Sequence, residues 1–439
     1  MQTTKLVIAA VLLAALSGAV WWAKRHPQSD TSTTTPTSPT VVNIPDASID
    51  SIAIQKKDAS AITLERKNGK WAITAPAAFP ADQDVAGGVV TSLSPVTADS
   101  VVEDKPTDVS KYGLNAPSLT VTVHEKKGKS DEISFGDDVP AGSLVYAQHK
   151  GDPKVYTVSS SIKTSLDKSV NDLRDKRLLT FDTNQLTRIE LASAKTDAEF
   201  GKNSQNEWAI VKPEPYRADN FQVEELLRKL SDAKMDLSDS AENTQKATAA
   251  YATGMPVRTV KLTDSSGTQS LDVRKVKDDY YAKSSVVAGV FKVSSDLGKE
   301  VEKSLEDFRN KKIFDFGFSD PTRLEVQQGA STKTLVRSGT DWKLNGQNQD
   351  TGSVQAWIDK LRDLSAAKFV ATGVTSPEAT VTVVSNDGKR TEKVDFAKTA
   401  DGYIARRANQ PGLYQLDVKP VNDMLEASRA IKPAASGKK

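Results

Sequence analysis

Cysteine is absent from the sequence, which excludes disulfide bonds, thiolate zinc sites, a cysteine nucleophile and a lipid-modified N-terminal cysteine. Neither sign of charge dominates, because 59 lysines and arginines stand against 57 aspartates and glutamates. That balance gives no electrostatic reason to expect a nucleic acid as a partner. With 38% hydrophobic and 26% charged residues, the composition excludes a polytopic membrane protein, a collagen-like chain and a wholly disordered one.

Motifs that indicate a reaction, a metal or a cofactor are missing as well. The histidines His26, His124 and His149 lack the spacing of metal ligands, and no serine lies in a Gly-x-Ser-x-Gly turn. Neither the dinucleotide-binding pattern Gly-x-Gly-x-x-Gly nor the phosphate-loop pattern Gly-x-x-x-x-Gly-Lys-Ser/Thr occurs. Asp137 and Asp138 form a carboxylate pair, but adjacent residues in a turn usually point apart. The sequence therefore predicts no catalytic residue, no metal site and no cofactor.

An uncharged apolar run extends from Leu6 to Ala23 near the N-terminus. As a helix rising 1.5 Å per residue it spans roughly 27 Å, close to the ~30 Å hydrocarbon thickness of a bilayer. Trp21 and Trp22 lie where interfacial aromatic residues belong. We therefore expect residues 1–23 to form an uncleaved, single-pass anchor, of which residues 6–23 lie in the inner membrane.

Two alternatives to this anchor stay open, a cleaved signal peptide and a cytosolic fate. Cleavage near Ala19 would fit a small-residue site, although the apolar run continues beyond it. Orientation does not follow from charge, since Lys5 with the amino terminus nearly balances Lys24 and Arg25. The short N-terminus and long C-terminal part favour export, which places the remainder of the chain in the periplasm.

Residues 24–47 are predicted to be a linker. The stretch from Pro27 to Thr40 consists mainly of Thr, Ser and Pro and has no large apolar side chain. Such a segment cannot bury a core, so we expect a flexible tether.

Beyond the linker, one order of landmarks occurs three times. Each repeat opens with two strands that lead into a tryptophan, with Asn68 and Gly69 as a hairpin turn in the first. A helix follows whose apolar residues fall at i, i+3, i+4 and i+7. The tryptophans are Trp71, Trp208 and Trp342, and the apolar stripes are Ala86, Val89, Val90 and Leu93; Val223, Leu226, Leu227 and Leu230; Val354, Trp357, Ile358 and Leu361. We expect these side chains in hydrophobic cores rather than at an exposed aromatic binding site.

Alternating strands and a closing helix complete each repeat. The closing stripe Ile162, Leu166, Val170 and Leu173 parallels Leu297, Val301, Leu305 and Phe308, whereas the third repeat is degenerate. The predicted fold class is α+β: three tandem related domains of antiparallel strands, each with a mid-unit helix and a closing helix, after one N-terminal transmembrane helix. The predicted boundaries are 1–23 for the anchor, 24–47 for the linker, 48–182, 183–317 and 318–433 for the repeats, and 434–439 for a polar tail.

The turn and strands of the first repeat resemble a known bacterial family. The turn from Tyr112 to Pro117 (Tyr-Gly-Leu-Asn-Ala-Pro) precedes the alternating strand that starts at Leu119, and Phe135 and Gly136 follow. This pattern resembles domain-of-unknown-function family 4340, most clearly over about residues 48–182. The resemblance implies a membrane-anchored envelope protein, with some members encoded beside ABC transporter components of the gliding-motility type. It implies no catalytic residue and no cofactor.

Basic clusters at the ends of the closing helices are the remaining candidate for a site. They comprise Arg174, Lys176 and Arg177 in the first repeat and Arg309, Lys311 and Lys312 in the second. Cations at a helix C-terminus offset the macrodipole, so a purely structural role is one interpretation. Docking of an acidic protein partner or of anionic lipid head groups is the other.

Repeated units without converging polar residues suit binding better than catalysis. We therefore expect a protein that is not an enzyme and that binds or scaffolds within an envelope protein complex, such as an ABC transporter. Two other classes stay open: an envelope hydrolase with carboxylates from separate repeats, and a solute-binding module.

Overall fold

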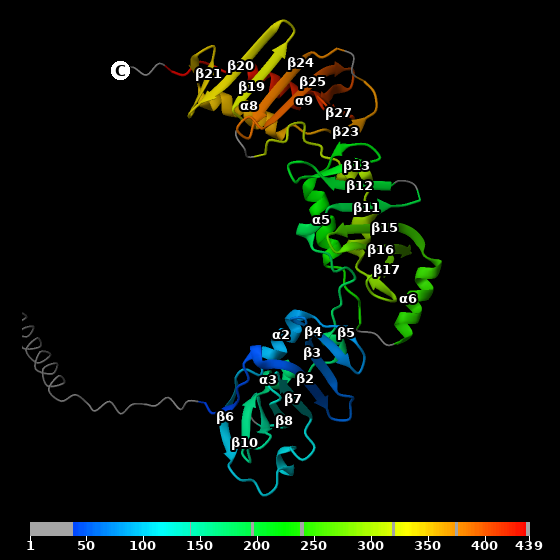
Figure 1. Cartoon of the computed structure of the whole chain (residues 1–439). Coiled ribbons are helices and arrows are strands. Elements are labelled where there is room, and N and C mark those ends of the chain that lie inside the picture. The colour runs from blue at the N-terminus through cyan, green and yellow to red at the C-terminus, as the bar shows by residue number, and fades with distance from the viewer. Residues whose placement is uncertain are drawn as a thin grey trace, which may run out of the picture. The chain divides into compact units, whose positions relative to one another are not determined.

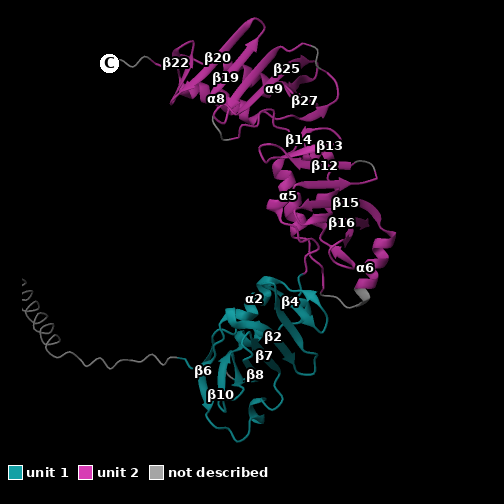
Figure 2. Ribbon diagram, viewed as in Figure 1, with its two compact units in different colours: residues 1–175 teal, residues 176–439 magenta. Residues whose placement is uncertain are grey.

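The computed structural model describes residues 38–140, 142–194, 197–237, 241–317, 321–373 and 376–435. The predicted anchor, most of the linker and the end of the tail lie outside these residues. Among the helices of the described residues, none is both long and apolar enough to cross a membrane. The chain divides into two compact units, residues 1–175 and 176–439 (Figure 2).

The fold is α+β and contains three mostly antiparallel sheets. We call each sheet with its helices a module. The sheet of the first module has the order β1 (Thr40–Val42), β6 (Val96–Glu103), β10 (Val155–Ser159), β9 (Leu144–His149), β8 (Ser130–Asp138), β7 (Leu119–Glu125), β2 (Ile49–Lys56), β3 (Ile62–Lys67), β4 (Lys70–Ala75) and β5 (Phe79–Pro80). Its helices are α2 (Gln83–Thr91), α3 (Ser160–Leu166) and α4 (Val170–Leu173) (Figure 1).

The second and third modules make up the second compact unit. The second sheet has the order β14 (Tyr216–Arg217), β13 (Trp208–Lys212), β12 (Asp197–Lys202), β11 (Arg188–Ala192), β15 (Met255–Asp264), β16 (Gly267–Val276), β17 (Asp279–Ser284) and β18 (Val290–Val293). The third has the order β22 (Gln347–Gln349), β21 (Asp341–Leu344), β20 (Ser331–Ser338), β19 (Arg323–Gln328), β24 (Ala379–Ser385), β25 (Arg390–Thr399), β26 (Gly402–Arg407), β27 (Leu413–Leu416) and β23 (Lys368–Val370). Their helices are α5 (Asn220–Ser231), α6 (Ala241–Thr253), α7 (Ser295–Glu302), α8 (Thr351–Asp363) and α9 (Val418–Arg429), with a 3₁₀ turn η4 (Leu305–Phe308) after α7.

The three predicted helix stripes are confirmed as core. Every member of the three stripes is buried, and so are the three hairpin tryptophans. The stripes lie on α2, α5 and α8, except that Leu93 follows the end of α2 by two residues. An aspartate is the N-cap residue of each of these helices: the carboxylate of Asp82, Asp219 or Asp350 accepts a backbone N–H of the first turn. The hairpin at Asn68 and Gly69 has positive φ at both residues, as a tight two-residue turn requires.

The closing helix differs from the prediction in the first two modules. It is interrupted there, giving α3 and α4 in the first and α7 and η4 in the second. The physical reason is a capping box at the restart: Ser169 pairs reciprocally with Asp172, and Ser304 with Asp307. In the third module α9 continues unbroken.

Each module starts with a short extended segment that packs into its own core. We call these segments straps: residues 39–44, 176–181 and 311–316. The carbonyls of Pro39, Lys176 and Lys311 accept the backbone N–H groups of Ala98, Met235 and Ala366, just after the mid-unit helix. The buried strap side chains are Val41, Val42 and Ile44; Leu178 and Leu179; Ile313, Phe314 and Phe316. They belong to the hydrophobic core of the module that the strap precedes in the chain.

The Tyr-Gly-Leu turn is held by a close backbone approach. Gly113 has φ of +71°, and a Cβ at Gly136 would lie 2.0 Å from the Tyr112 carbonyl oxygen. The Tyr112 hydroxyl donates to Glu103 at 2.8 Å, and its ring lies 4.9 Å from that of Tyr146. The motif therefore builds a small satellite core beside the main one.

Candidate functional site at the junction of the second and third modules

The predicted basic residues occupy two different kinds of position. Arg174 and Arg309 cap the last turns of α4 and η4, whereas the four others belong to the straps that come next in the chain. The guanidinium of half-buried Arg174 lies 4.2 Å from the ring centroid of Phe79, and burial lowers the pKa of Arg174. Arg174 therefore packs against its own module.

Arg309 is buried between two aromatic rings from different modules. Its guanidinium lies 3.9 Å from the ring centroid of Tyr216 in β14 and 3.6 Å from that of Phe369 in β23. The same guanidinium pairs with Glu306 at 2.9 Å. A Cβ at Gly412 would lie 2.8 Å from it, so a larger side chain there would displace this arginine. Arg309 therefore joins the second module to the third and is not exposed to a partner.

The strap cations have mostly exposed side chains. Arg177, Lys311 and Lys312 are exposed, and Lys176 is half-buried. Their backbones bind the segment after the mid-unit helix, through bridges of Arg177 with Lys234 and of Lys312 with Ser365. The Lys312 ammonium donates to the Arg362 carbonyl at 3.1 Å. Docking of a partner at these side chains stays a prediction.

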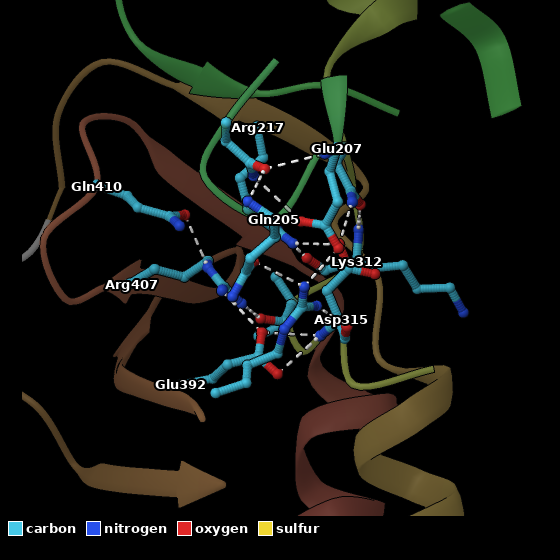
Figure 3. Close-up of polar contacts among 12 residues, drawn as sticks. Gln205, Glu207, Arg217, Lys312, Asp315, Glu392, Arg407 and Gln410 are labelled. Atoms are coloured by element: carbon cyan, nitrogen blue, oxygen red, sulfur yellow. Dashed lines mark hydrogen bonds and ion pairs between the residues drawn. The ribbon is translucent and has the colours of Figure 1, made fainter. Parts of the chain in front are cut away.

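Ion pairs connect the second and third modules around the third strap (Figure 3). Arg217 pairs with Asp315 at 3.2 Å and donates to the Lys312 carbonyl. Arg390 pairs with Glu207 across the junction and also donates to the Asp315 carbonyl. We call the following residues the junction cluster: Gln205, Glu207, Arg217, Asp315, Arg390, Glu392, Arg407 and Gln410.

The most buried pair of the junction cluster holds the strap by its backbone. Glu392 and Arg407 have side-chain exposures of 3% and 7% and pair at 2.8 Å. Glu392 accepts the Asp315 backbone N–H at 2.9 Å, and Arg407 donates to the Ile313 carbonyl. Burial, and secondarily the charge of Arg217, lower the pKa of Arg407, while Glu392 opposes that change. We call such a pair of side chains, which lies on two neighbouring strands and binds the backbone of a strap, a socket.

The second module holds its strap with an uncharged socket at the same positions. Gln269 and Ser284 occupy the strand registers that Glu392 and Arg407 occupy in the third sheet. Gln269 accepts the Thr180 backbone N–H at 2.8 Å, and the Ser284 hydroxyl donates to the Leu178 carbonyl at 2.5 Å. The two straps are thus bound by the same backbone atoms with different side-chain chemistry.

The first module has a titratable pair in the same registers. Asp131 and His149 lie 3.2 Å apart at the positions of Glu392 and Arg407. Burial opposes ionisation of Asp131, but hydrogen bonds from Lys129 and His149 outweigh it, and the pKa of Asp131 lies below its usual value.

A cavity of about 400 Å³ opens beside the junction cluster. Glu207, Asp315 and Glu392 line it, so carboxylates from separate modules converge there. Each of these carboxylates accepts a hydrogen bond from an arginine of the junction cluster. Among the described residues, no group of three or more His, Cys, Asp or Glu side chains could hold a metal ion.

No member of the junction cluster was predicted from the sequence. The residues lie far apart in the chain, in β14, β25, β26, the third strap, the turn before β13 and the loop after β26, and no short motif connects them. One signal was available: aligning the repeats places Glu392 and Arg407 opposite Gln269 and Ser284. The other inward-facing residues of these strands, Val394, Phe396, Tyr403 and Ala405, are apolar, so a charged pair in this alternating pattern would have marked these positions.

Comparison with known proteins identifies the family but no individual relative. No curated protein and no solved structure matches the chain. The family model described as a domain of unknown function, DUF4340, matches residues 71–209 and 208–380, which together form most of the chain. The two matches begin at Trp71 and Trp208, which hold the same position in their modules. The chain therefore belongs to the DUF4340 family.

Proposed function

We propose that this protein is a non-enzymatic, membrane-anchored envelope protein that binds or scaffolds other components of an envelope or ABC-transporter-type assembly. The apolar run of residues 6–23 would anchor it in the inner membrane, with the modules in the periplasm. The resemblance of its turn and strands to the family motivates the choice of assembly.

The observation that carries the proposal is the construction of the junction. Two cross-module ion pairs and the stacked Arg309 hold the second module against the third, and the buried socket fixes the third strap, whose Asp315 takes part in one of these pairs. Desolvating charged groups is costly, and its attested benefit is to fix one arrangement of parts. A fixed arrangement of modules suits a protein that presents surfaces to partners, and tethering raises the local concentration of those surfaces at the membrane.

A hydrolase is the second candidate, because Glu207, Asp315 and Glu392 line one cavity. General acid–base catalysis requires a carboxylate that can reach the substrate. In this cavity the carboxylates are engaged by Arg390, Arg217 and Arg407. The arrangement therefore supports a structural cluster better than a catalytic one.

In-cell photo-crosslinking tests the proposal. A photoreactive residue would be placed at exposed positions on each module of the full chain, and crosslinked peptides would be identified by mass spectrometry. We expect one recurrent envelope protein at a contiguous set of positions. Random crosslinks at every position would contradict scaffolding, and loss of a measured hydrolytic activity in Glu207→Gln would favour the hydrolase.

A further inference from the structure

The cavity beside the junction cluster has the size of a small-ligand site. Its volume of about 400 Å³ lies within the range of roughly 300–1,000 Å³ that is usual for ligand pockets. Residues of the second and third modules line it together, and both modules belong to one compact unit. Trp208, Ile210 and Tyr216 contribute apolar surface, and most of the other lining residues are polar or charged. The cavity therefore suits a small, polar molecule that also has some apolar surface.

The acidic residues that line this cavity are all paired with arginines. The three ion pairs are Glu207 with Arg390, Asp315 with Arg217, and Glu392 with Arg407. One more cation, Lys389, lines the cavity, and it is exposed to solvent. Breaking an ion pair that is shielded from water is costly, because it leaves a charge without its partner. A charged ligand would have to compete with these pairs, whereas a neutral ligand can bind while they stay intact.

Hydrogen-bonding groups of both kinds are left over among the lining side chains. Gln205 and Gln410 accept hydrogen bonds through their amide oxygens from arginines of the junction cluster, at 3.1 and 2.8 Å (Figure 3). Asn220 in the same way accepts the backbone N–H of Trp208 at 2.8 Å. Because arginines and backbone N–H groups only donate, these bonds fix which end of each amide is the nitrogen. Within the part of the chain that the structure describes, the three amide nitrogens donate to no group, and Oδ1 of Asp315 accepts from none.

We infer that this cavity binds a neutral sugar, a mono- or disaccharide. A hydroxyl group both donates and accepts, so the hydroxyls of one ring can accept from the amide nitrogens and donate to Asp315. An ionised carboxylate ligand cannot donate to Asp315, and an ammonium ligand cannot accept from the amides. The C–H groups of the ring would pack against the apolar part of the wall. The inference goes beyond the proposed function, because a sugar site does not require a protein partner.

Titration calorimetry on the full-length protein, in a detergent without a sugar head group, tests this inference. The neutral probes are glucose, galactose and N-acetylglucosamine, and the charged probes are glucuronate and glucosamine, which keep the glucose ring. We expect a neutral probe to bind with a dissociation constant of about 1 mM or lower, and both charged probes to bind at least about fivefold more weakly. Gln205→Ala/Gln410→Ala should raise the dissociation constant of the neutral probe at least about fivefold, since two donors are lost. The matched control Gln347→Ala/Gln355→Ala removes two side-chain amides of the third module outside the cavity and should leave binding unchanged.

Three results would overturn the inference: no binding of any neutral probe, equal or tighter binding of a charged probe, or equal losses in the two double variants. The comparison of probes uses the unaltered chain, so it decides the question even if a variant has a lowered melting temperature. The outcome is separable from that of the proposed function. Sugar binding without recurrent crosslinks would keep the sugar site and remove the scaffold, and recurrent crosslinks without sugar binding would do the reverse.

Discussion

The second and third modules bind their straps with the same backbone atoms but opposite chemistry. In the second, neutral Gln269 and Ser284 hold Thr180 and Leu178; in the third, charged Glu392 and Arg407 hold Asp315 and Ile313. A buried neutral hydrogen bond and a buried ion pair can therefore serve one geometry. They differ in the cost of losing one partner, because an unpaired buried charge destabilises the fold far more than an unpaired amide.

Removing the strap of the second module should have the largest effect on the free energy of unfolding. A fragment of residues 185–317 lacks Leu178 and Leu179, which are fully buried in the second core. Each buried leucine contributes about 1.5–3 kcal/mol, so a fragment of residues 176–310 should be more stable by about 3–6 kcal/mol. Urea unfolding of the two fragments measures this difference. Equal stability would mean that the strap is not part of the module.

Breaking the charged socket of the third module should have the second largest effect on stability. Arg407→Ala leaves Glu392 buried without its cation, which should destabilise the third module by about 3–5 kcal/mol. The neighbouring Arg406→Ala removes an exposed pair with Asp395, worth about 0–1 kcal/mol, and serves as the control. Chemical denaturation of both variants provides the comparison, and similar losses would contradict a special role for the buried pair.

Replacing the socket residues of the third module with those of the second should restore part of the stability that Arg407→Ala loses. Glu392→Gln/Arg407→Ser removes both charges and copies the residue pair of the second module. We expect a loss smaller than that of Arg407→Ala by about 1–3 kcal/mol, since no buried charge is left unpaired. If the double variant is as unstable as Arg407→Ala, side-chain volume rather than charge determines the socket.

Replacing the stacked arginines should lower stability modestly, and by different amounts at the two positions. Arg309→Lys loses contact with two rings and should cost about 1 kcal/mol, whereas Arg174→Lys loses contact with one ring and should cost less. Thermal unfolding of the full chain measures both. A larger effect at Arg174 would reverse this order.

The pH dependence of the first module should be the smallest effect. The folded pKa of Asp131 lies below its ordinary value, so its contribution to stability is present above the unfolded pKa of about 3.9. This contribution is lost as pH falls through the folded pKa. Asp131→Asn should therefore flatten the acid side of the stability profile between about pH 5 and 2. Asp50→Asn, on the exposed side of β2, is the control.

The repeated core could be predicted from the sequence because local periodicity determines which side chains face inward. The stripes on α2, α5 and α8 and the tryptophans at Trp71, Trp208 and Trp342 are buried as predicted. The interruption after α3 was not predicted, since a capping box competes with an unbroken apolar stripe and only the packed structure shows which one dominates.

By itself, then, the sequence determined the α+β class, the number of repeats and the buried faces, because each depends on residues a few positions apart. Only the tertiary structure decided which residues meet at the junction. Arg217, Asp315 and Arg390 are brought together by sheet order and strap docking, over separations at which no sequence spacing is informative. It also decided that Arg309 is stacked between rings while its predicted counterparts Lys311 and Lys312 are exposed, since burial depends on which module packs beside each residue.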